Sequence, residues 1–84
     1  MTEVSAWRAN DVVEYDAMRE FATILTALLL RKSSDDPSSA LAASAEVRVL
    51  RQDVLGVDAY DRAAVSSLAT RIGSRIIELR ESGT

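Results

Sequence analysis

The chain has 84 residues, with 10 basic and 13 acidic side chains, a formal net charge of -3, and neither His nor Cys. The lack of both residue types excludes imidazole bases, thiol nucleophiles, Cys/His zinc sites and disulfide bonds. Because acidic side chains outnumber basic ones, a strongly electropositive surface for binding phosphates is not expected.

The first predicted helix covers about residues 5–31, and a loop over residues 32–36 follows it. At 100° per residue, its large apolar side chains form one stripe with two residues on the flanks. The stripe consists of Trp7, Met18, Phe21, Leu25 and Leu28, and the flanking residues are Ile24 and Leu29. Residues 21–30 are apolar around most of the helix, but this run is far shorter than the ~20 residues needed to cross a bilayer.

The second predicted helix covers residues 37–55. It begins at Asp36-Pro37, because Asp is a favoured N-cap and Pro is favoured at the first helical position, where its missing N–H costs nothing. Gly56 is predicted to end this helix in the left-handed conformation. Its apolar residues recur at spacings of four, three and four: Ala43, Val47, Leu50 and Val54.

The third predicted helix covers residues 58–81. Asp58 is its expected N-cap, and Asp61 favours the same helix start through the helix dipole. Its apolar stripe consists of Val65, Leu68, Ile72, Ile76 and Leu79. Gly73 lies beside Ala69 on one edge of this helix. A mid-helix Gly costs ~1 kcal/mol relative to Ala, so Gly73 marks either a close helix approach or a tolerated surface position.

These three segments predict an all-α fold. No segment alternates with the period of a strand, and the connections are short, so we expect a three-helix up-down-up bundle in a single domain over residues 1–84.

Several large apolar residues lie away from the apolar stripes of the three predicted helices, and this indicates self-association. Such residues need no explanation singly, but several of them on so small a chain do. A 27-residue first helix is ~40 Å long, whereas a compact chain of this size is roughly 30 Å across, so this helix should overhang its bundle. We therefore predict a homodimer. Its expected interface residues are Val12, Ile24, Leu30, Leu41, Leu55 and Ile77.

Glu14 is a conspicuous polar residue, because it falls near the centre of the first apolar stripe. One hypothesis is a salt bridge to an arginine of the third helix, Arg62 or Arg71. The other is a metal ligand or a partner contact that fixes the register of the helices.

Two acid-x-x-acid pairs, Asp11 with Glu14 and Asp58 with Asp61, each place two carboxylates on one helical face where they could share Mg²⁺. All-helical nucleotide pyrophosphohydrolases use paired carboxylates of this general type. Both pairs here lie near predicted helix N-termini, where acids ordinarily cap helices. Capping is therefore the main interpretation, and a Mg²⁺-dependent nucleotide hydrolase is the alternative.

The second and third helices with the turn at Gly56 have the dimensions of a helix-turn-helix. The N-terminal residues of its recognition helix would be Asp58 and Asp61, which repel phosphate. A modest basic face remains at Arg48, Arg51, Arg71 and Arg75. We interpret it as solvated, with nucleic-acid binding a weaker alternative.

The sequence as a whole predicts a small interaction protein of regulatory or adaptor type without enzymatic activity or a cofactor. Its N-terminus resembles no signal peptide, so we expect a cytoplasmic protein and no membrane contact. Nine of its ten basic residues are Arg, and Ala is abundant, which is typical of a high-GC bacterial genome. The sequence does not identify the partner.

Overall fold

Three α-helices joined by short connections form an up-down-up bundle, which confirms the predicted all-α fold. In the computed structural model these are α1 (Thr2–Asp35), α2 (Ala40–Gly56) and α3 (Arg62–Ser82), with a 3-10 turn, η1 (Pro37–Ser39), before α2. The structure describes the backbone of residues 2–82 and the side chains of residues 12–82, and this range contains no strand.

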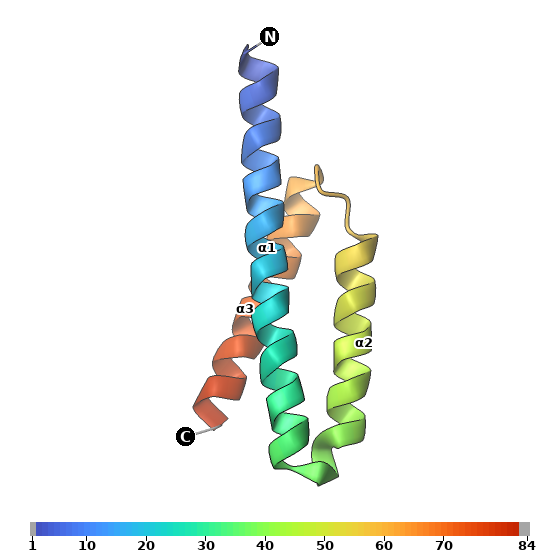
Figure 1. Cartoon of the computed structure of the whole chain (residues 1–84). Helices are drawn as coiled ribbons and strands as arrows, with labels where there is room; N and C mark the ends of the chain where they lie inside the picture. Colours follow the sequence, from blue (N-terminus) through green and yellow to red (C-terminus); the bar gives the residue numbers. More distant parts are fainter. Residues whose placement is uncertain (1, 83–84) are drawn as a thin grey trace.

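α1 packs against both other helices, and α3 crosses behind it at an angle, whereas α2 and α3 make few direct contacts with each other (Figure 1). Its N-terminal part extends beyond α2 and α3, as the sequence predicts. The molecule measures 54 × 24 × 16 Å, with a radius of gyration of 15.0 Å, against about 12 Å for a compact chain of this length. A single chain is therefore long and flat.

The core lies along one face of α1, against which α2 and α3 both pack. The stripe predicted on α3 is buried in full, from Val65 to Leu79. On α2, Ala43 and Leu50 are buried, and Val47 and Val54 pack against the core at partial exposure. The spacing of apolar residues therefore located the inward faces of these two helices.

The buried face of α1 differs from the prediction. It consists of Met18, Ala22, Leu25 and Leu29. Phe21 is 41% exposed, so its placement in the core stripe was wrong, and the side chain of Trp7 lies outside the described residues. The physical reason is that α1 packs against two helices, and the face between them is centred on the row from Met18 to Leu29.

At the connection between α1 and α2, two observed helix boundaries differ from the predicted ones. α1 continues through Asp35, so the loop predicted over residues 32–36 was wrong. The helix stops only because Asp36 precedes a proline, which disfavours the helical conformation, and its φ and ψ are -134° and 92°. Asp36 is an N-cap, as predicted, and its side chain accepts hydrogen bonds from the amide and hydroxyl of Ser38 at 3.1 and 2.6 Å. The first residues after it form η1 rather than α-helix.

The second connection also differs from expectation. No described glycine has a positive φ, so the left-handed cap predicted at Gly56 was wrong. The chain leaves α2 at Val57, whose backbone is extended and whose side chain packs against the core. α3 starts at Arg62 and not at residue 58. Asp58 accepts a hydrogen bond from the amide of Tyr60 at 2.9 Å, and Asp61 caps α3 by accepting one from Ala64 at 3.1 Å.

Gly73 lies in open space, so the close helix approach considered for it is wrong. A Cβ atom added there meets nothing within 4 Å. We therefore expect Gly73→Ala to raise the free energy of unfolding by about 0.5–1 kcal/mol, because alanine loses less backbone entropy on folding. Urea denaturation measures this gain, and Ala69→Gly in the same helix should change stability in the opposite direction. A loss of stability in Gly73→Ala would contradict the open surroundings.

Candidate functional site

All six apolar residues predicted for an interface are exposed in the single chain. Their exposed fractions run from 38% for Ile24 to 89% for Leu41. The structure adds four large apolar residues to the exposed set: Val13, Phe21, Val49 and Tyr60. The exposure of these residues agrees with the prediction. Their burial by a second chain stays a prediction.

An open groove of about 580 Å³ runs between α1 and α2. It brings together Leu30 of α1 and Leu55 of α2, which are 58% and 81% exposed. Thr23 and Thr26 also line it, but their hydroxyls donate to the carbonyls of Arg19 and Ala22 in their own helix, at 3.1 and 2.8 Å. The threonine hydroxyls are thereby satisfied within α1. The apolar residues of the lining are Ala22, Ala27, Leu30, Leu50, Val54 and Leu55.

The charged side chains of this groove are all basic. They are Arg19 and Arg51, and no carboxylate lines the groove. The Arg19 guanidinium lies over the Tyr15 ring, 5.9 Å from its centroid. An adjoining hollow on α2 shares Arg51 and Leu55, adds Arg48, and again contains no carboxylate. A third hollow shares Arg19 and Thr23 with the groove and includes Asp16 and Glu20, so the positive charge is confined to the groove and its α2 side.

A second apolar surface, here termed the α1 stripe, lies on another face of the same helix. It consists of Val13, Ala17, Phe21 and Ile24, all exposed. At 100° per residue these four positions fall within an 80° sector. Glu20 lies directly beside this sector, whereas Asp16 lies farther round the helix, toward the groove. The spacing of four, four and three between these residues is visible in the sequence. It was missed because Phe21 had been assigned to the predicted core stripe with Met18 and Leu25.

Glu14 forms a salt bridge with Arg62, whose Nε lies 3.5 Å from its Oε2. Both side chains are about half exposed. This confirms the ion-pair hypothesis and identifies the partner, since Arg71 instead lies 3.6 Å from Asp53.

The four carboxylates considered for Mg²⁺ do not form a described cluster. Glu14 pairs with Arg62, and Asp58 and Asp61 bind backbone amides on the connection before α3. The side chain of Asp11 lies outside the described residues. Among residues whose side chains are described, no group of three or more acids could hold a metal ion. The geometry supports capping for Asp61 and a turn contact for Asp58, whereas capping was wrong for Glu14, which lies well inside α1 and pairs with Arg62 instead.

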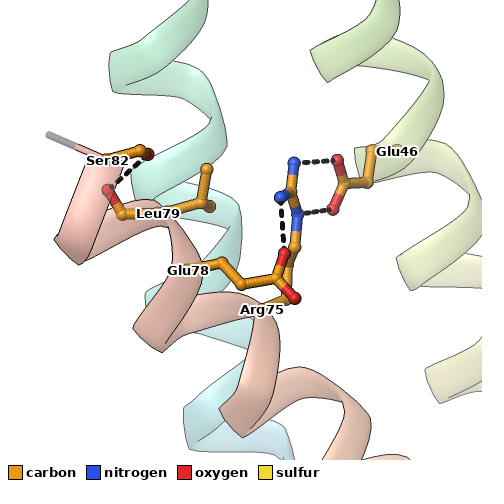
Figure 2. A network of polar contacts seen from close by, with 5 residues as sticks. All are labelled: Glu46, Arg75, Glu78, Leu79 and Ser82. Atoms are coloured by element: carbon orange, nitrogen blue, oxygen red, sulfur yellow. Dashed lines mark hydrogen bonds and ion pairs between the residues drawn. The ribbon is translucent and has the colours of Figure 1, made fainter.

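The predicted basic face is divided by ion pairs between α2 and α3. Arg75 donates to both carboxylate oxygens of Glu46, at 2.7 and 3.0 Å, and to Glu78 at 3.0 Å (Figure 2). The hydrogen bonds to Glu46 raise the pKa of the Arg75 guanidinium above its ordinary value, against the opposing effect of burial, and Glu78 adds to the increase. Arg71 and Arg75 therefore tie two helices together, and this pairing partly neutralises the basic face.

Within the described range, no helix combines the length and apolar character of a membrane span. Comparison of the chain with protein-family profiles, with characterised proteins and with solved structures gives no match.

Proposed function

We propose that the chain is a protein–protein interaction module that acts as a homodimer, in a regulatory or adaptor role. The observation that carries the proposal is the open groove between α1 and α2, in which exposed Leu30 and Leu55 meet on an apolar floor. Contiguous apolar surface of this kind marks interaction sites on small proteins. The predicted interface residues supply further exposed area on all three helices.

The surface area of the chain supports the same proposal. Its accessible surface is 6035 Å², whereas folded monomers of this mass expose roughly 4,900 Å². The excess of about 1,100 Å² exceeds the ~800 Å² that each partner buries in a standard interface. The chain can therefore bury a standard interface against a second copy and still expose no less area than an ordinary folded monomer.

Light scattering after size exclusion tests the proposal. We expect wild type to give twice the chain mass at micromolar concentration. Leu30→Glu should raise the dissociation constant of the dimer by at least about 30-fold, because a carboxylate would be desolvated in the contact. Far-ultraviolet circular dichroism checks that this variant keeps its helices.

Ser67→Glu is the matched control, since it adds the same charge at an exposed position of α3 that lies outside the groove. It should leave the mass unchanged. Wild type that scatters as a monomer throughout the micromolar range would overturn the proposal.

A further inference from the structure

We infer that the groove between α1 and α2 also receives an acidic amphipathic helix of another protein, which displaces the second copy. The acidic residues of this helix lie on the flank that faces α2. The inference rests on the proposed interaction module and names the chemistry of its regulatory partner. Two features of the described residues carry it: the apolar floor of the groove, and arginines on the α2 wall with no carboxylate beside them.

The groove fits the apolar face of a helix. Small side chains such as Ala22 and Ala27 line its α1 side and let a partner approach closely. One exposed leucine stands on each wall, Leu30 on α1 and Leu55 on α2. Grooves of this kind bind amphipathic helices through apolar side chains spaced by three and four residues. An extended segment is disfavoured, because its backbone amides would lose hydration against an apolar floor.

The α2 wall carries the unopposed positive charge of the groove. Arg48, Arg51 and Leu55 follow at spacings of three and four, so they lie on one face of α2. Both arginines are exposed, and neither forms an ion pair with a described side chain. The carboxylates of this helix, Glu46 and Asp53, pair with arginines of α3 instead. A helix in the groove therefore meets two guanidinium groups beside a leucine.

The α1 wall is closer to electrical balance. Arg19 lines the groove, but it shares a neighbouring hollow with Asp16 and Glu20 of the same helix. The partner helix therefore needs acidic residues on one flank only, the flank that faces α2. Such an uneven charge pattern selects one direction of the helix in the groove.

A second copy matches the apolar surface of the groove but not its charge. In a two-fold contact the same surface of both copies meets, so groove faces groove. The groove of the second copy brings further arginines and no carboxylate among its lining residues. Like charges across an interface weaken it and favour a partner of complementary charge. An acidic helix therefore competes with the second copy, and its binding dissociates the homodimer.

A designed peptide tests this inference. The probe is as long as α2, has leucines spaced by three and four residues, and carries glutamates on one flank. A control peptide of the same composition carries its glutamates opposite the leucines. We expect wild type to bind the probe at least about tenfold more tightly than the control, and the dimer to become complexes of one chain with one peptide. Fluorescence anisotropy measures binding, and light scattering measures mass. Higher salt should weaken binding of the probe without weakening the homodimer.

Substitutions on α2 distinguish the partner from the second copy. Arg48→Glu and Arg51→Glu should each weaken binding of the probe about tenfold and leave the homodimer at least as tight as wild type, because they remove like charges from the two-fold contact. The double variant R48E/R51E should prefer a peptide with lysines in place of the glutamates. Arg80→Glu on α3 makes the same charge change outside the groove and should alter neither affinity.

The outcomes separate this inference from the proposed function. A homodimer that binds neither peptide, or binds both equally, overturns the acidic partner and leaves the homodimer standing. The same holds if Arg51→Glu leaves binding of the probe unchanged. A monomeric wild type that binds the probe with the expected charge dependence supports the acidic partner and overturns the homodimer. A probe that binds without dissociating the dimer overturns the competition at the groove.

Discussion

We expect Met18→Lys to be largely unfolded at pH 7 and to regain stability as the pH rises toward 10. Met18 is 0% exposed and is the first residue of the buried row on α1. A lysine held there loses hydration, which lowers its pKa in the folded state by about 3–5 units below the ordinary ~10.4. Between the two pKa values the unfolded chain binds more protons, so the free energy of unfolding rises with pH, by ~1.4 kcal/mol per unit.

The penalty at pH 7 is then about 4–5 kcal/mol, which is comparable to the whole stability of a small domain. Urea denaturation between pH 7 and pH 10.5 measures the slope. Met18→Leu should show none of this pH dependence. Phe21→Lys, at a position that is 41% exposed, should show little. Equal slopes for the lysines at positions 18 and 21 would contradict the core face described for α1.

Three consecutive leucines should respond differently to the same substitution. Leu29 is 1% exposed, so Leu29→Ala should lower the free energy of unfolding by about 2–5 kcal/mol through lost burial and a cavity. Leu28 packs against the core at partial exposure and should show an intermediate loss. Leu30 is 58% exposed in the single chain and lines the groove, so Leu30→Ala should chiefly weaken the dimer.

Urea denaturation at a concentration low enough to dissociate the dimer measures the first two effects, and light scattering measures the third. Leu29→Met keeps most of the side-chain volume and should cost less than about 1.5 kcal/mol. If Leu30→Ala destabilised the single chain as much as Leu29→Ala, the division between core and groove along α1 would be wrong.

The periodicity of apolar residues was sufficient to predict the buried face of a helix that packs chiefly against one neighbour. α3 packs chiefly against α1, and each of its five predicted core residues is buried. α1 packs against two helices, and its residues 21–30 are apolar around most of the helix, so periodicity alone could not choose between Phe21 and Ala22. The small side chain of Ala22 turned out to be the buried one.

Local rules located the caps better than the helix ends. Asp36 is a capping residue, as predicted. α3 is capped by Asp61 and not by Asp58, which was the expected N-cap. The extension of α1 to Asp35 was missed because serines and acids are tolerated in a last helical turn, and proline restricts only the residue directly before it. At Gly56, burial of the Val57 side chain favours an extended exit over the left-handed cap.

The sequence predicted that each interface candidate is exposed. It did not predict which candidates from different helices lie side by side. Leu30 and Leu55 were each placed opposite a core face, and both are exposed. Their meeting in one groove depends on the height at which α2 packs along α1, which no local pattern encodes. Arg51 was assigned to a basic face with Arg71 and Arg75, yet the latter two pair with carboxylates of α2.

The central place of α1 shapes the order in which the chain folds. α1 and α2 are joined through residues 36–39 alone, so their pairing closes a short loop and loses little chain entropy. The contacts between α1 and α3 join residues much farther apart in sequence, and contacts of this kind form more slowly. Pairing of α1 with α2 thus costs less chain entropy than docking of α3, the step that buries the row from Val65 to Leu79. The Arg75–Glu46 bond spans α2 and α3, so it forms only after this final step.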